Sequence, residues 1–272
     1  MDTDHFTTLH WLVAAAAAFA CGSIPFGPIV ARAHGVDLRT VGSGNIGATN
    51  VGRALGRGWG ILVYVLDAAK GALPVMVAGS MANILGKQPE AMAPGELWGW
   101  LSLPVAAVLG HMFSPWMGFK GGKGVATGSG AMLAVWPVLT GPVVVAIGLW
   151  ALVLAVTRMV SVASVVAAIA IPLTVAFSSV ARTGDGTPDG SLPLQHALHV
   201  AAVLEDDERG DGSLPLQHAV PAIIVTGAVA ALVVFKHRGN MQRVLAGTAC
   251  WRGRLPSGVP SPVRATDENA TV

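Results

Sequence analysis

The chain has 272 residues, of which 53% are hydrophobic and only 12% are charged, with a formal net charge of +2. A soluble globular domain carries about 25% charged residues, so this composition excludes an ordinary soluble protein. It indicates instead an all-α, multi-pass helical bundle in a membrane. The two cysteines, Cys21 and Cys250, stand at opposite ends of the chain, so we expect no disulfide.

The hydropathy pattern predicts seven transmembrane helices. Asp2 and Asp4 precede the first of them where a signal peptide would be positive, so we expect that helix to stay uncleaved. The fourth and fifth are shorter than the ~20 residues that a perpendicular helix needs. They could form one stretch interrupted by Pro137 and Pro142, so six spans is the alternative count. The predicted spans are Trp11–Ala31, Trp59–Leu85, Leu97–Met117, Lys123–Leu139, Gly141–Thr157, Ser161–Val180 and Leu216–Phe235.

The distribution of charge predicts the topology. With seven spans and the N-terminus outside, 13 of the 17 Lys and Arg residues fall in inner segments, and 11 of the 15 Asp and Glu residues fall outside. Positive residues are enriched in cytoplasmic loops of membrane proteins. Six spans would put the basic loops on opposite faces, so we expect seven spans and a cytoplasmic C-terminus.

We expect a single membrane domain over residues 1–250. Residues 181–215 are predicted to form an acidic external loop, in which the nonapeptide Asp189–Ala197 recurs at Asp211–Ala219. One short repeat indicates a local duplication and not a repeat architecture. The histidines that it duplicates do not predict a metal site. Residues 251–272, rich in Pro, Arg and Ser, are predicted to be a disordered cytoplasmic tail.

Three polar clusters fall on the predicted cytoplasmic side, and the first is Val41–Arg53. It places hydroxyl, amide and guanidinium groups in a glycine frame. Such a stretch is typical of a turn-rich connection and also of an anion-binding loop, which we favour. Its candidate binding residues are Gly42, Ser43, Gly44, Asn45, Thr49, Asn50 and Arg53.

The second cluster is Lys120–Thr127. Its glycines would let backbone N–H groups approach a ligand, and its lysines supply positive charge, so it predicts a phosphate site. The stretch lacks the spacing of a P-loop, so we expect no nucleotide. Its candidate residues are Lys120, Gly121, Gly122, Lys123 and Gly124.

The third cluster follows the last span and is Lys236-His237-Arg238-Gly239-Asn240 with Arg243. Taken alone, it is typical of the basic flank of a membrane helix. Within the second span, Asp67 and Lys70 stand three residues apart and can pair on one helix face. A structural ion pair that supports the first loop and a contact with substrate are both open for these two residues.

Several catalytic patterns are absent from the sequence. No histidine is followed five positions later by aspartate, and there is no Gly-x-Ser-x-Gly elbow or Cys/His set with metal spacing. We therefore expect no metal and no cofactor, and no strong general base is evident.

Taken together, the clusters closely resemble the acyl-phosphate-dependent glycerol-3-phosphate acyltransferases of bacterial phospholipid synthesis. The resemblance covers about residues 22 to 248, although Ala249 stands where the family usually has glutamate. The matching stretches are Gly22–Gly27, Gly42–Arg53, Leu66-Asp67 with Lys70-Gly71, Gly110-His111 with Gly118–Thr127, Arg158–Ser164, and His237-Arg238 with Asn240 and Arg243.

The resemblance implies a multi-pass enzyme of the bacterial cytoplasmic membrane. It would join glycerol 3-phosphate to the acyl group of an acyl phosphate, without a nucleotide, nucleic acid or cofactor. Membrane lipids and the enzyme that makes acyl phosphate are the expected partners. By motif position, Ser43, Arg53, Lys123, His237 and Asn240 would be catalytic, and Ser161 would join Lys120 and Arg238 among the residues that bind phosphate.

A transporter for a phosphorylated solute is the competing hypothesis. Such a protein is expected to show internal repeats and polar groups near the membrane midplane. The sequence shows neither, because its polar residues gather at one predicted face.

Overall fold

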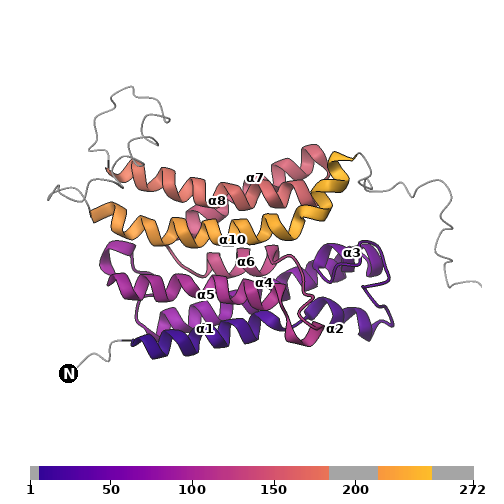
Figure 1. Cartoon of the computed structure of the whole chain (residues 1–272), viewed down its shortest axis with the longest axis horizontal. Coiled ribbons are helices and arrows are strands. Elements are labelled where there is room, and N and C mark those ends of the chain that lie inside the picture. The colour runs from indigo at the N-terminus through magenta and orange to yellow at the C-terminus, as the bar shows by residue number, and fades with distance from the viewer. Residues whose placement is uncertain (1–5, 184–213, 247–272) are drawn as a thin grey trace, which may run out of the picture.

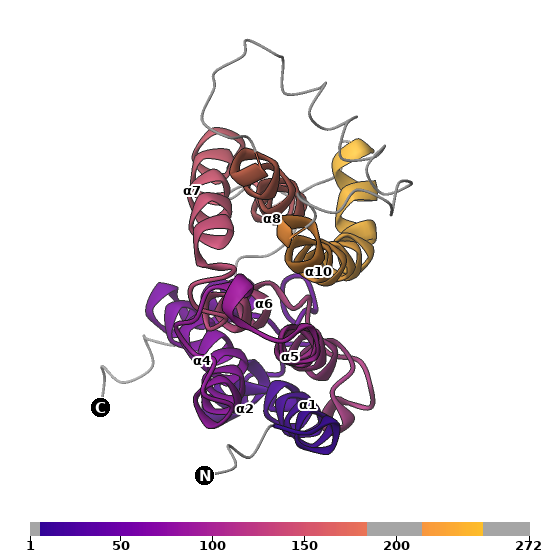
Figure 2. The same cartoon turned by 90° about the vertical axis from the view of Figure 1, so that its left-hand side faces the viewer.

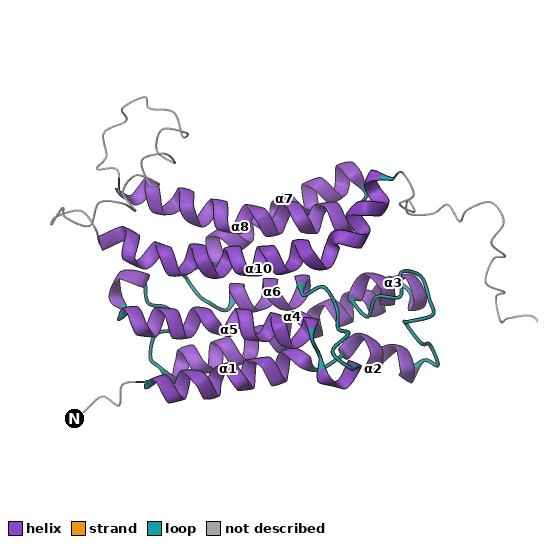
Figure 3. Ribbon diagram, viewed as in Figure 1, coloured by secondary structure: helices purple, strands orange, loops and turns teal. Residues whose placement is uncertain are grey.

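The structure is a computed structural model that describes residues 6–183 and 214–246. All regular structure in these residues is helical, which confirms the expected fold class (Figure 3). Residues 184–213 of the expected loop, Ala249 and the tail 251–272 lie outside the described residues. The helices are α1 (Thr8–Ser23), α2 (Phe26–Ala33), α3 (Ala48–Leu55), α4 (Arg57–Met81), α5 (Pro94–Met112), α6 (Val125–Leu133), α7 (Thr140–Thr157), α8 (Val160–Thr183) and α10 (Leu214–Leu245), with short 3₁₀ helices η1 (Pro89–Ala91) and η2 (Pro115–Met117).

The helices form two layers, which are best seen end on in Figure 2. One layer holds α1 to α6, and the other holds α7, α8 and α10. Within the first layer α5 packs on α1 and α4 packs on α6, while in the second layer α8 packs between α7 and α10. The layers meet where α10 packs on α5 (Figure 1).

Within residues 6–183 and 214–246, six segments contain helices that are long and apolar enough to cross a membrane. They are Thr8–Ala33, Arg57–Met81, Pro94–Met117, Thr140–Thr157, Val160–Ser179 and Ala219–Leu245. Six of the seven predicted spans correspond to these segments. The count of seven and the orientation of the termini stay predictions.

The fourth predicted span is the exception, because the helix expected over Lys123–Leu139 is wrong in its length. Only the nine residues of α6 are helical there, about 14 Å of helix, against a hydrocarbon core of about 30 Å. The segment nevertheless reaches the far end of the bundle, where Gly86, which follows α4, donates its N–H to the carbonyl of Trp136 at 3.0 Å. Val135 and Leu139 are fully buried, and irregular backbone is tolerated at membrane depth where protein surrounds it.

The first span is broken near its C-terminal end, between α1 and α2. Pro25 keeps the preceding residue extended, so the helix stops and leaves carbonyl groups without helical partners. The Ser114 hydroxyl donates to the carbonyl of Ser23 at 2.6 Å, and Lys70 Nζ donates to the carbonyl of Ile24 at 2.6 Å.

The ion pair predicted from the sequence forms, and it stabilises the interruption between α1 and α2. Lys70 Nζ lies 2.7 Å from Asp67 Oδ1, and both residues are buried in α4. Because the ammonium group also donates to the carbonyl of Ile24, the pair holds the turn between α1 and α2. The structure therefore favours the structural role over contact with substrate.

We expect Lys70→Met to lower the free energy of unfolding by about 3–5 kcal/mol, because it leaves the Asp67 carboxylate buried without its partner. Denaturant titration in detergent micelles measures this change. Lys87→Met is the matched control, since Lys87 is exposed. The double variant Asp67→Leu/Lys70→Met should recover part of the loss. A loss in Lys70→Met no larger than in the control would contradict this role.

Candidate functional site

The first polar cluster is a loop held by one buried amide. Asn50 is 1% exposed, and its Oδ1 accepts the backbone N–H of Ser43 at 3.0 Å. Its Nδ2 donates to the carbonyls of Leu38 at 3.2 Å and Val41 at 3.0 Å. A Cβ at Gly42 would lie 2.4 Å from Asn50 Oδ1, so only glycine fits there. Asn50 and Gly42 therefore shape the loop, and the amide of Asn50 is fully engaged with the backbone.

Of the other polar residues in the first cluster, one also bonds to the backbone of its own loop, and several are exposed. Asn45 Oδ1 accepts the N–H of Gly47 at 2.9 Å, which is a local turn contact. No hydrogen bond joins Ser43 to the other two clusters in the part of the chain that the structure describes. The exposed members of the cluster are Gly42, Ser43, Gly44, Thr49 and Arg53.

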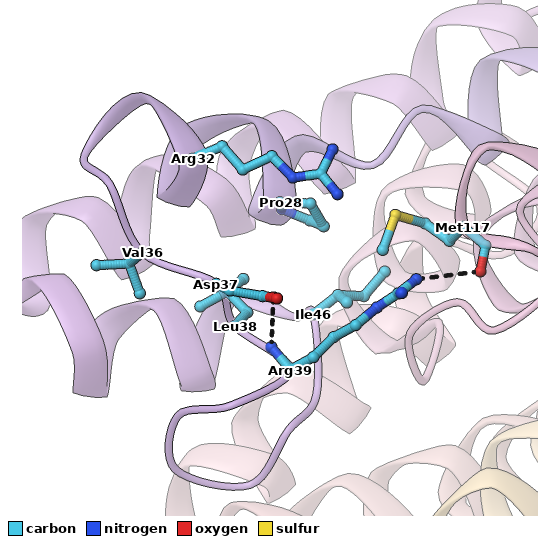
Figure 4. A pocket seen from close by; sticks show the side chains of 8 residues that line it. All are labelled: Pro28, Arg32, Val36, Asp37, Leu38, Arg39, Ile46 and Met117. Atoms are coloured by element: carbon cyan, nitrogen blue, oxygen red, sulfur yellow. Dashed lines mark hydrogen bonds between the residues drawn. The ribbon is translucent and has the colours of Figure 1, made fainter.

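A contact near η2 joins the segment before the first cluster to the segment before the second cluster. Arg39 donates from its guanidinium to the carbonyl of Met117 at 3.3 Å, and its own N–H bonds to Asp37 Oδ1 (Figure 4). The recess around these residues, which Arg32 also lines, has a free volume of about 10 Å³. That is close to the space that one water molecule needs, so the recess is too small for a phosphorylated substrate.

The glycines of the second cluster pack on the end of α5. Gly121 donates its N–H to the carbonyl of Met112 at 3.1 Å, and Gly122 donates to the carbonyl of His111 at 3.1 Å. A Cβ at Gly122 would lie 2.2 Å from His111 Nε2, and one at Gly121 would lie 2.0 Å from the His111 carbonyl oxygen. These glycines allow the loop to close on the helix end, and their N–H groups are not available to a phosphate.

The free N–H groups of this region belong instead to the start of α6. Gly124 precedes the helix with a φ of +79°, and Gly128 bonds back to its carbonyl. No acceptor for the N–H groups of Val125 and Ala126 occurs within residues 6–183 and 214–246. A helix N-terminus of this kind attracts anions.

Lys123, in the second cluster, lies directly before the N-terminus of α6 and interacts electrostatically with residues of the first and third clusters. Its side chain is partly buried, whereas Lys120 is exposed. Burial, followed by repulsion from Arg243 and then Arg53, lowers the pKa of Lys123 to about 8. Lys123 also interacts electrostatically with His237. Positive groups from α3, α10 and the segment before α6 therefore converge.

The third cluster presents a histidine with a fixed tautomer. His237 is 2% exposed, and its Nδ1 lies 2.8 Å from the carbonyl oxygen of Val233. A carbonyl only accepts, so Nδ1 carries the hydrogen, and in the neutral ring Nε2 is left as an acceptor. Arg238 is exposed, and its guanidinium stacks 4.1 Å over the ring of Phe235.

Asn240 connects α10 to α8. Its Nδ2 donates to the hydroxyl of Ser161, and its Oδ1 accepts from the guanidinium of Arg243. Arg243 belongs to the third cluster, but the sequence assigns it no site role, because a basic residue after a membrane span is ordinary in sequence. Its contact with Asn240 and its effect on Lys123 place it with the others.

The structure thus brings together residues that lie far apart in the sequence. We call this set the basic cluster, and it consists of Arg53, Lys123, Ser161, His237, Asn240 and Arg243. It combines three cations with hydroxyl, amide and imidazole groups, a combination that suits an anion with several oxygen atoms. The roles of its members and of Ser43 and Lys120 stay predictions.

Known proteins resemble this chain over most of its length. A family described as glycerol-3-phosphate acyltransferase matches residues 12–247. The glycerol-3-phosphate acyltransferase of Geobacter sulfurreducens is 38% identical over 241 residues, which is 88% of this chain and 96% of the relative. The relative from Anaeromyxobacter dehalogenans is 55% identical over 129 residues, which is 46% of this chain and 60% of that relative. This second match therefore spans less than two thirds of the relative's length.

A solved structure shows the same arrangement of helices. The crystal structure of PlsY, an integral membrane glycerol 3-phosphate acyltransferase, in its glycerol 3-phosphate form, matches with a TM-score of 0.65 and 32% identity. The match covers 89% of this chain and 96% of that chain.

Gly122→Ala should displace the loop that carries Lys123, because the new methyl group would lie 2.2 Å from His111 Nε2. We expect a loss of about 1–3 kcal/mol in unfolding free energy and faster amide exchange over residues 119–124. Exchange measured by mass spectrometry checks this. Gly148→Ala is the control, since no atom lies near a Cβ there. Equal exchange in the two variants would show that the close approach is unimportant.

Proposed function

The chain belongs to the glycerol-3-phosphate acyltransferase family, and from that premise we propose that it transfers a fatty acyl group from acyl phosphate to the sn-1 hydroxyl of glycerol 3-phosphate. The products are 1-acyl-glycerol 3-phosphate and inorganic phosphate. The observation that carries this proposal is the basic cluster, in which three segments bring three cations together at one end of an apolar helical bundle and α8 adds the hydroxyl of Ser161.

The basic cluster suits a reaction between two phosphorylated molecules. Each substrate brings negative charge, so cations must offset the repulsion between them. Arg53 and Arg243 provide guanidinium groups that bind phosphate with two hydrogen bonds, and Lys123 provides charge beside the N-terminus of α6. The apolar acyl chain remains among the membrane helices, where it needs no polar partner.

The chemistry requires little of the protein beyond positioning. The sn-1 oxygen attacks the acyl carbon, the bond from that carbon to the phosphate oxygen breaks, and phosphate leaves. Because phosphate is a good leaving group, no protein nucleophile is needed, and orientation with charge stabilisation suffices. In this proposal a phosphate oxygen of the substrate takes the hydroxyl proton, while His237 Nε2 orients the hydroxyl. An acidic limb in the pH profile of kcat that disappears in His237→Asn would instead make His237 the base.

The proposed setting is the bacterial cytoplasmic membrane, with the basic cluster on the cytoplasmic side. The distribution of Lys and Arg supports this orientation. The enzyme that makes acyl phosphate is the proposed partner, since an acyl phosphate delivered at the membrane surface would need no soluble carrier.

Purified protein in detergent, given acyl phosphate and labelled glycerol 3-phosphate, should form labelled 1-acyl-glycerol 3-phosphate. Acyl-CoA should not replace acyl phosphate as donor. Arg53→Ala should abolish turnover or raise KM for glycerol 3-phosphate at least tenfold, because a charge-assisted phosphate contact is lost. No product with either donor would contradict the proposal, and uptake of glycerol 3-phosphate into proteoliposomes would favour the transporter.

The lowered pKa of Lys123 predicts a pH dependence. The phosphate binds the protonated amine, and a lysine with pKa about 8 loses its charge as the pH rises past that value. We expect kcat/KM for glycerol 3-phosphate to fall about tenfold between pH 7 and pH 9, since kcat/KM reports the free enzyme. Lys123→Arg should flatten this limb, because arginine stays charged. If kcat/KM falls equally between pH 7 and pH 9 in the wild type and in Lys123→Arg, Lys123 is not the group whose titration causes the fall.

A further inference from the structure

The members of the basic cluster come from both layers of the bundle, so their geometry depends on how the layers are aligned. Arg53 and Lys123 belong to the layer of α1 to α6, whereas His237 and Asn240 belong to α10 in the other layer. Figure 2 shows α10 above α5, on which it packs. A small slide of α10 along α5 would separate the two halves of the cluster.

The apolar packing between these layers does not strongly fix the position of α10 along α5. Val225, Val229 and Val233 of α10 are buried in the same hydrophobic core as Val108 and Met112 of α5. These valines repeat at four-residue intervals, and hydrophobic contact is not directional. Alignment therefore needs a polar contact with defined geometry.

Lys236 provides a contact of this kind at the end of α5. Its Nζ donates to the carbonyl of Met112 at 3.0 Å, and the same oxygen accepts the N–H of Gly121 at 3.1 Å. The ammonium group also lies 4.5 Å from the centre of the Phe113 ring. A cation at the C-terminal end of a helix is favoured by the helix dipole.

We propose that Lys236 is a positioning residue, which through the carbonyl of Met112 aligns His237 and Asn240 with Lys123. The Met112 oxygen connects the two halves, because Gly121 lies two residues before Lys123 and Lys236 precedes His237. The expected effect on kcat rests on the proposed function, whereas the contact between Lys236 and Met112 does not depend on it.

Lys236→Met keeps the apolar stem and removes the donor. We expect kcat to fall about 30-fold to 100-fold with KM for glycerol 3-phosphate within about threefold of wild type, because misplacement of catalytic groups by about 1 Å costs about 10²-fold. Amide exchange over residues 118–124 should quicken, while exchange in α4 stays unchanged. Lys236→Arg keeps a cationic donor and should retain kcat within about threefold. Lys87→Met is the control and should match wild type throughout.

Other outcomes would overturn the proposal. A raised KM with unchanged kcat in Lys236→Met would make Lys236 a direct ligand of phosphate. Unchanged exchange over residues 118–124 would show that the contact holds nothing in place. If Lys236→Met does not fold, a fall in kcat beyond tenfold in Lys236→Arg contradicts the proposal. Amide exchange can be measured without turnover. An inactive wild-type protein would therefore count against the proposed function, while the exchange over residues 118–124 would still test the contact of Lys236.

Discussion

The structure depends on supplying hydrogen-bond donors to carbonyl groups where membrane helices are interrupted. A carbonyl left unpaired in an apolar environment costs several kcal/mol, so each break requires a dedicated partner. At the break after α1, Ser114 and Lys70 donate to the carbonyls that lack helical partners, and at the end of α5 the donors are Gly121, Gly122 and Lys236. Both breaks lie at the end of the bundle that carries the basic cluster. The loops of the candidate site are thus consequences of how the helices stop.

This requirement also separates the residues that build the site from those that face a ligand. Glycine-rich motifs suggest backbone N–H groups turned toward phosphate, yet Gly121 and Gly122 use theirs on α5. The amide of Asn50 is likewise engaged with the loop around Ser43. What remains for an anion is the set of cationic side chains and the start of α6.

Hydropathy alone was enough to predict an all-helical bundle and six of its membrane segments. It failed for α6, because an apolar run does not reveal where a helix yields to buried irregular backbone. The i, i+3 spacing predicted the pair of Asp67 and Lys70, but its role depended on Ile24, which is distant in sequence. The three clusters could be expected to meet because of their charge and their resemblance to a family. Lys236 and Arg243 stand in the third cluster, but the sequence assigns them no role in the site, since their contacts are tertiary and their sequence context is that of any basic flank.

The direction of α8 and α10 has a consequence for how this chain tolerates insertions. Ser161 lies in the first turn of α8 and Asn240 lies near the end of α10, so the two residues that join these helices are at one end of the helix pair. The chain leaves α8 and enters α10 at the other end. In general, each doubling of the length of a loop costs only about 0.6 kcal/mol of closure entropy. Added residues between α8 and α10 therefore enter at the end of the bundle away from the basic cluster, while the packing of α8 on α10 keeps the cluster residues aligned.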